Sequence, residues 1–103
     1  MSELPAGVRI EQVFLVEAQY TPEAEAKRPA VRAQHLARIA QLRAAGTIIE
    51  AGAYSDGLTS SILLVHASDA AAALAVAQAD IYVASGVWGE IEARPFGRVV
   101  SED

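Results

Sequence analysis

The chain has no cysteine among its 103 residues. This absence excludes disulfide bonds, thiolate catalysis and cysteine-based metal or iron–sulfur sites. The two histidines, His35 and His66, are too few for a histidine-rich metal site. No carboxylates stand beside them at the spacing of a two-histidine, one-carboxylate centre. We therefore expect neither a metal ion nor another cofactor.

Basic residues and long apolar runs are scarce as well. Eight Lys and Arg stand against thirteen Asp and Glu, which gives a formal net charge of -5. That balance argues against nucleic acid as a partner. No apolar run approaches the ~18 residues of a membrane span, and the start, Met1–Pro5, lacks the basic and apolar regions of a signal peptide. We expect a cytoplasmic protein without a nucleic-acid or membrane partner.

What the chain does contain is enough apolar material for one small domain. It is 52% hydrophobic but only 6% aromatic, and alanine is abundant. Such a composition supports a real core in which the elements pack closely through small side chains. Residues 1–10, with Pro5 and Gly7, are expected to form an N-terminal tail. Residues 11–103 are expected to form a single domain.

One helical stripe contains an unexpected histidine. Val31, His35, Ile39 and Leu42 are spaced four, four and three apart, so they share one face of a helix. A buried imidazole with an unpaired nitrogen costs about 1–3 kcal/mol, so His35 requires a polar partner. We place this helix at residues 29–45, with a break at Arg28, because proline disfavours helical geometry in the residue before it.

The remaining patterns alternate between strands and helices. Strands are expected at 13–19, 47–54, 60–67 and 90–94, a second helix at 70–79, and a short turn capped by Asp80. Thr21 and Ser68 are expected as helix N-caps, and residues 95–97 are expected to bend the last strand or to end its pairing. The order β-α-β-β-α-β predicts an α+β, ferredoxin-like fold, a four-stranded antiparallel sheet with two helices on one face. The uncovered face is apolar and predicts a homodimer.

Four segments resemble the YCII-like (YciI-like) family. The segment Arg28–Arg38 is similar to its Arg-x-x-His-Leu helix start, Ala79–Trp88 to its Asp-Pro-Tyr-x-x-x-Gly-Val-Tyr segment, Glu92–Phe96 to its closing Pro-Phe strand, and Ile49–Gly52 to the end of its second strand. The resemblance implies a dimeric α+β barrel. It also implies a cleft beside the sheet that holds a pair made of His35 and Asp80, with Arg32 and Ser60 as substrate-binding residues.

The implied chemistry is proton transfer. A histidine takes or gives a proton near neutral pH, and a carboxylate on its far nitrogen fixes the tautomer. Arg32 is suited to a substrate carboxylate or phenolate. One branch of the family removes chloride from a chlorinated hydroxyquinol, so we expect a cofactor-free enzyme that catalyses an elimination or isomerisation of a small, aromatic or hydroxylated metabolite.

Several alternatives stay open at this point. The fold also suits a non-catalytic small-molecule-binding or regulatory module, and a relative of cofactor-free monooxygenases or muconolactone isomerase. His35 is open to interpretation as a core histidine, Asp80 as a plain N-cap and Arg32 as a solvated charge. Tyr82 and Trp88 suit a core, a dimer interface or a pocket wall, and His66 has no assigned role.

Overall fold

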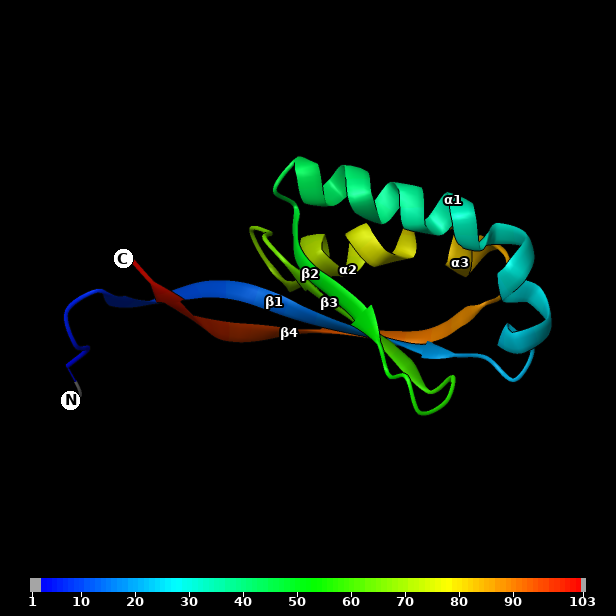
Figure 1. Ribbon diagram of the computed structural model, residues 1–103, viewed down its shortest axis with the longest axis horizontal. Coiled ribbons are helices and arrows are strands. Elements are labelled where there is room, and N and C mark those ends of the chain that lie inside the picture. Colours follow the sequence, from blue (N-terminus) through cyan, green and yellow to red (C-terminus); the bar gives the residue numbers. More distant parts are fainter. Residues whose placement is uncertain (1–2, 103) are drawn as a thin grey trace.

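The computed structural model describes residues 3–102 as four strands and three helices. In chain order these are β1 (Val8–Tyr20), α1 (Ala24–Ala44), β2 (Ile48–Ala53), β3 (Ser60–Val65), α2 (Ala70–Gln78), α3 (Ile81–Ala84) and β4 (Trp88–Ser101). The strands form one antiparallel sheet in the order β2-β3-β1-β4 (Figure 1). This is the predicted ferredoxin-like fold, and α3 is the short turn expected after Asp80.

The helices cover one face of the sheet (Figure 1). Alternate strand residues point toward them, and Val16 and Leu63 are among the buried side chains of this face. From α2, Ala73 and Ala77 are fully buried, so the small side chains expected from the composition let this helix lie close to the sheet. None of the helices within residues 3–102 has the length and apolar character needed to span a membrane.

The alternate residues of the strands that point away from the helices lie on the opposite face of the sheet. Leu15 pairs with Leu64, Glu17 pairs with Ile62, and all four side chains are only partly buried. No helix within the described residues covers them. This is the apolar face from which the sequence predicts a second copy of the chain.

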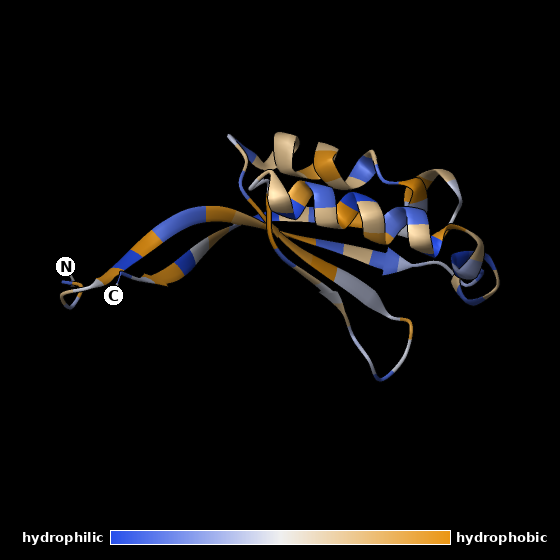
Figure 2. Cartoon of the chain, turned by 45° about the horizontal axis from the view of Figure 1, so that its top comes forward, coloured by the Kyte–Doolittle hydropathy of each residue, from blue (hydrophilic) through white to orange (hydrophobic). Residues whose placement is uncertain are grey.

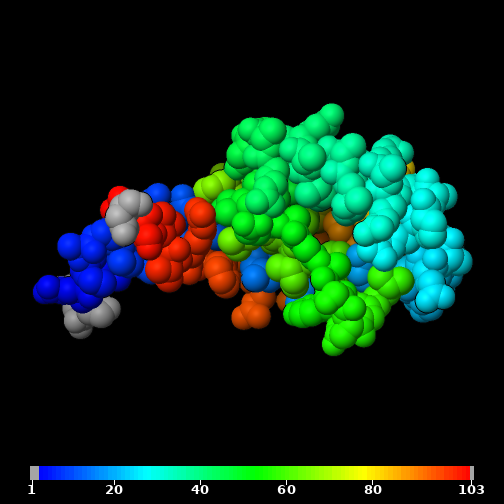
Figure 3. Space-filling model, in the orientation of Figure 1, coloured from blue at the N-terminus to red at the C-terminus, as the bar shows by residue number. Residues whose placement is uncertain are grey.

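Two strands continue past the rest of the sheet. β3 pairs with β1 only from Phe14 onward, whereas residues 8–13 of β1 pair with residues 96–101 of β4 alone. We call these two segments the arm. It projects from the body in Figures 2 and 3, and the molecule accordingly measures 49 × 27 × 26 Å. β1 thus begins at Val8, inside the segment 1–10 that is expected to be a tail.

The predicted helix break at Arg28 is wrong. α1 runs without interruption from Ala24 to Ala44 and includes Pro29. Its first turns lie at an angle to the remainder in Figure 1, which is the kink that proline produces when its ring meets the preceding turn. Thr21 is not the N-cap either, because its Oγ donates to the carbonyl of Gly86 at 2.6 Å and ties the start of α1 to the end of α3.

Two further expectations about element ends are corrected. Of the two outcomes expected at residues 95–97, the end of pairing is wrong, since β4 continues to Ser101 and Pro95 pairs with Phe14. β4 is an edge strand, and one side of its backbone needs no partner, so a proline is tolerated there. The cap of α2 is Asp69 rather than Ser68, and its side chain accepts a hydrogen bond from the Ala72 N–H at 2.8 Å.

Candidate active site

His35 and Asp80 form a buried pair between α1 and the segment that joins α2 to α3. Nδ1 of His35 lies 2.7 Å from Oδ1 of Asp80, although the residues are 45 positions apart. The histidine is 7% exposed and the aspartate 2%. This distance lies within the roughly 2.6–3.2 Å of a working hydrogen bond. The family resemblance therefore implied two residues that meet in space, and their catalytic role stays a prediction.

The position of Asp80 follows from the start of α3. Its backbone is extended (φ -76°, ψ 145°), and its Oδ1 accepts a hydrogen bond from the Tyr82 N–H at 2.9 Å. Asp80 is thus the expected N-cap. The same carboxylate oxygen caps α3 and faces His35, so the capping role and the pairing role coexist in one side chain.

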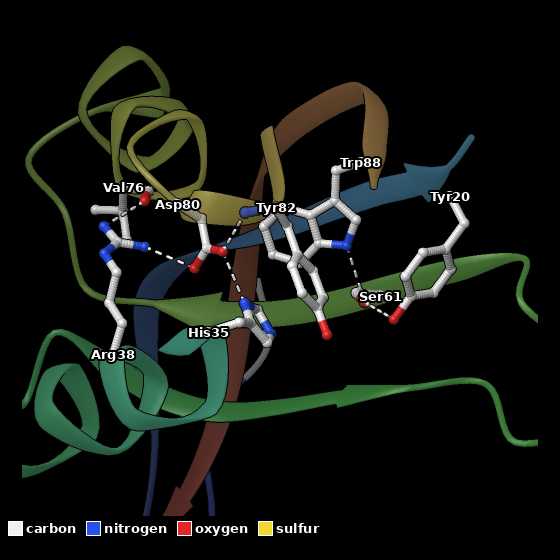
Figure 4. A network of polar contacts seen from close by, with 8 residues as sticks. All are labelled: Tyr20, His35, Arg38, Ser61, Val76, Asp80, Tyr82 and Trp88. Atoms are coloured by element: carbon white, nitrogen blue, oxygen red, sulfur yellow. Dashed lines mark hydrogen bonds and ion pairs between the residues drawn. The ribbon is translucent and has the colours of Figure 1, made fainter. Parts of the chain in front are cut away.

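Arg38 is a third member of this network that the sequence reasoning missed. Its Nη1 donates to Oδ2 of Asp80 at 3.0 Å, and its Nη2 donates to the Val76 carbonyl at 2.8 Å (Figure 4). Arg38 follows His35 by three positions, which places both side chains on neighbouring parts of the α1 surface. The spacing of three residues between His35 and Arg38 was the feature of the sequence that could have pointed to Arg38. The result is a carboxylate held on both oxygens.

These contacts decide the charge of Asp80. Burial raises the pKa of Asp80, but the hydrogen bonds from His35, the Tyr82 N–H and Arg38 outweigh it and hold the pKa below its ordinary value. The carboxylate is therefore ionised at neutral pH and only accepts hydrogen bonds. It follows that Nδ1 of His35 is the donor and carries the proton.

Two aromatic rings fix the plane of the imidazole. The ring of His35 stacks on Tyr82, with centroids 3.7 Å apart and an interplanar angle of 7°. Trp88 meets the imidazole edge-on at 5.2 Å and 84°. Nε2 of His35 forms no hydrogen bond with the described residues, and it is not among the fully buried atoms that lack a partner. This nitrogen is the one available to a ligand.

A pocket of about 210 Å³ is lined in part by His35. Its walls come from α1, α3, β2, β3 and the ends of β1 and β4, and Figure 3 shows the surface hollowed between α1 and β2. The residues that line the pocket include His35, Arg32, Tyr82 and Trp88. Tyr82 and Trp88 are only 1% and 2% exposed, so they serve both as core and as pocket wall.

Ser60 does not line this pocket. Its Oγ donates to Oε2 of Glu17 at 2.7 Å, and Glu17 lies on the uncovered face of the sheet. Successive strand residues point to opposite faces, so the next residue, Ser61, is the serine of the pocket. Ser61 accepts from Trp88 Nε1 at 3.3 Å and donates to the Tyr20 hydroxyl at 2.9 Å (Figure 4).

Removal of Arg38 tests how Asp80 is held. We expect Arg38→Met to lower the free energy of unfolding by about 1–3 kcal/mol, because Oδ2 of the buried carboxylate loses its partner. A lowered pKa gives stability that is present above the unfolded-state pKa and is lost as the pH falls through the folded-state pKa. Since the variant raises the pKa of Asp80, its acid unfolding should begin at a higher pH, which circular dichroism measures.

Arg43→Met is the matched control. Arg43 also lies on α1 and pairs with Glu50 at 3.0 Å, but both side chains are exposed. Exposed ion pairs contribute little, about 0–1 kcal/mol. Equal shifts of the acid transition in the two variants would contradict the arrangement described for Arg38.

Comparison with known proteins identifies the family. The model of the YCII-related domain matches residues 13–97. The chain belongs to the YCII family. An uncharacterized protein of Haemophilus influenzae is 36% identical over 95 residues, which cover 84% of this chain and 97% of that protein. Protein YciI of Escherichia coli is 32% identical over 96 residues, with 84% and 98% covered.

A solved structure shares the fold of this YCII domain. It is the 5-chloro-2-hydroxyhydroquinone dehydrochlorinase TftG of Burkholderia phenoliruptrix, in complex with 2,5-dihydroxybenzoquinone. The TM-score is 0.68 at 20% sequence identity, and the match covers 82% of this chain and 92% of that one. At this identity the likeness establishes the fold, and it agrees with the resemblance seen in the sequence.

Proposed function

We propose that this YCII domain is a cofactor-free, cytoplasmic enzyme that eliminates or isomerises a small hydroxylated metabolite, with His35 as general acid and base. The observation that best supports this proposal is that the two imidazole nitrogens of His35 have different surroundings. Nδ1 is bound to the Asp80 carboxylate, whereas Nε2 is unpaired among residues 3–102, and His35 lines the pocket. One nitrogen is thus held for orientation and the other is left for a substrate proton.

The proton transfer follows from this asymmetry. With the proton on Nδ1, the lone pair of Nε2 accepts a proton from an O–H or C–H group of the substrate. The imidazolium that forms is stabilised by the ionised Asp80, as in other histidine–carboxylate pairs. Arg38 holds the carboxylate from its far side, so Asp80 orients His35 without itself taking the proton.

The name of the structural neighbour supports the reaction class. A dehydrochlorinase removes a proton and a chloride from its substrate. In such a step a base takes the proton, and chloride leaves with the electron pair of the carbon–chlorine bond. His35 supplies the base that this step needs. Arg32, which lines the pocket, is suited to bind a phenolate or enolate oxygen of such a substrate.

Proton exchange detects this activity before the natural substrate is identified. We expect the protein in D₂O to accelerate deuterium incorporation into the ring positions of 2,5-dihydroxybenzoquinone, followed by NMR. We also expect release of chloride from 5-chloro-2-hydroxyhydroquinone. Saturable binding of both compounds with neither exchange nor chloride release contradicts the enzyme proposal and favours the binding-module alternative.

We also propose that the chain acts as a homodimer through the uncovered face of the sheet. Leu15, Ile62 and Leu64 form an apolar patch there without a covering helix. On the arm, the paired residues Ile10 and Val99 are 50% and 67% exposed. A two-stranded ribbon alone is marginally stable in water, and a second copy would bury these side chains.

A charge on that face tests the dimer. We expect Ile62→Lys to yield a monomer in sedimentation equilibrium, because a dimer interface would bury the ammonium group. The folded monomer should tolerate the change, since Glu17 is the cross-strand partner of residue 62. Ala33→Lys, at an exposed position of α1, serves as the control and should leave the dimer intact. A monomeric wild-type protein would overturn this proposal.

A further inference from the structure

Two arginines line the pocket of a protein that is acidic overall. Arg28 and Arg32 lie there with His35, and no Asp or Glu lines it. The chain as a whole has a formal net charge of -5. The three residues are spaced four and three apart on α1, so one helix face presents all of them to the pocket. The sign of the charged groups at the pocket is thus opposite to the net charge of the chain, and this difference calls for a physical explanation.

The two arginines of the pocket differ from most arginines elsewhere on the molecule. Arg9, Arg38, Arg43 and Arg98 each lie within 4.0 Å of a carboxylate oxygen. Within residues 3–102, neither Arg28 nor Arg32 has such an ion pair. Glu25 lines a neighbouring depression together with Arg28 and Arg32. It forms no ion pair with either guanidinium, so both remain available to an anion in the pocket.

Arg28 is held in place rather than extended into solvent. Its guanidinium carbon lies 5.6 Å from the centroid of the Tyr20 ring, in cation–π geometry. The Tyr20 hydroxyl is in turn bonded to Ser61. The Nε of Arg28 is buried and has no hydrogen-bond partner. A buried donor without a partner costs free energy. Nη1 and Nη2 of Arg28 are not among the fully buried atoms without a partner, so these are the donors that an anion in the pocket can reach.

Apolar and aromatic side chains make up much of the remaining pocket wall. Leu36 and Ile39 of α1 face it together with the rings of Tyr82 and Trp88. Its volume of about 210 Å³ is below the roughly 300–1,000 Å³ of pockets for drug-sized ligands. These walls suit a molecule built on one ring.

We propose that the ligand of this pocket is a small, single-ring anion whose carboxylate or phenolate is bound by Arg28 and Arg32. The inference deepens the proposed function, because it adds Arg28 as a specificity-determining residue and places the anionic group away from the atom that exchanges a proton with His35. Arg28 supplies a fixed donor, and Arg32, which is exposed, supplies a second cation at the pocket mouth. Planar guanidinium groups suit the two oxygens of a carboxylate.

Benzoate and benzamide form a matched pair of probes, because they have the same ring and nearly the same shape but differ in charge. We expect isothermal titration calorimetry to give at least about tenfold tighter binding of benzoate than of benzamide, which corresponds to one charge-assisted contact. Arg28→Gln should weaken benzoate binding by about tenfold and leave benzamide binding unchanged. Arg32→Gln should act in the same direction, and Arg43→Gln, distant from the pocket, should change neither.

Three results would overturn the proposal: equal affinity for the two probes, no benzoate binding at millimolar concentration, or benzoate binding that Arg28→Gln leaves intact in a folded variant. Thermal unfolding of each variant confirms that it is folded. The measurement needs no turnover. If benzoate discrimination is found but no deuterium exchange or chloride release, the enzyme proposal fails while the anion site stands.

Discussion

Replacement of Asp80 by alanine is expected to destabilise the protein by about 3–5 kcal/mol, the cost of removing one partner from a buried charge pair. The side chain has no solvent exposure, and its oxygens accept from His35, Arg38 and the Tyr82 N–H. Alanine leaves these donors without an acceptor and also leaves a cavity. Urea unfolding followed by circular dichroism measures the loss.

Asp69→Ala provides the comparison for this loss. Asp69 is also an N-cap and accepts a backbone hydrogen bond at 2.8 Å, but it is exposed and has no ion pair within residues 3–102. Loss of such a cap costs about 1 kcal/mol. The difference between the two variants in the free energy of unfolding therefore gives the contribution of the buried ion pair. Equal destabilisation would mean that Asp80 acts only as a cap.

The loss of folding stability caused by Asp80→Ala should depend on pH in a defined direction. The pKa of Asp80 is lowered in the folded protein, so its contribution is fully present above the unfolded-state pKa, about 3.9. It disappears as the pH falls through the lower, folded-state pKa. The gap in stability between wild type and Asp80→Ala should therefore be constant near neutral pH and should narrow under acidic conditions.

Replacement of His35 by glutamine is expected to reduce turnover by about 10²–10⁴-fold, the usual contribution of a positioned acid–base group. Glutamine retains an N–H donor for Asp80, so we expect a folded protein, but it provides no group that exchanges a proton near neutral pH. The rate of deuterium incorporation or of chloride release measures the effect. Full activity of this variant would end the proposed role of His35.

His66→Gln is the natural control for His35→Gln, because the chain has only these two histidines. His66 is exposed at the end of β3 and does not line the pocket beside His35. We expect this variant to keep wild-type turnover. A similar loss in both variants would point to a general effect on the protein rather than to proton transfer by one imidazole.

Local sequence patterns predict much of the fold and part of the candidate site. The four-residue spacing around His35 and the capping position of Asp80 are visible in the sequence, because helix periodicity and N-caps are set by residues close together in the chain. The pairing of His35 with Asp80 came from the family resemblance. The three-residue spacing places Arg38 beside His35 on α1, but the sequence does not show that its side chain reaches the Val76 carbonyl, 38 positions away.

The other errors also have physical causes. Ser60 came from the family resemblance, and the neighbouring Ser61 lines the pocket instead, because successive strand residues point to opposite faces of the sheet. The arm was missed because its strands pair across almost the full length of the chain, Val8 with Ser101. At Pro29, the local preference against helical geometry gave way to a kink inside α1.

The edge-on contact between Trp88 and His35 has an optical consequence. Trp88 is the single tryptophan of the chain, it is buried, and its ring centroid lies 5.2 Å from that of the imidazole. All tryptophan fluorescence of the protein therefore originates at the pocket wall. A protonated imidazole or a bound aromatic ring at this distance alters the emission of an indole, so the intrinsic fluorescence reports on the charge and occupancy of the site without any attached label.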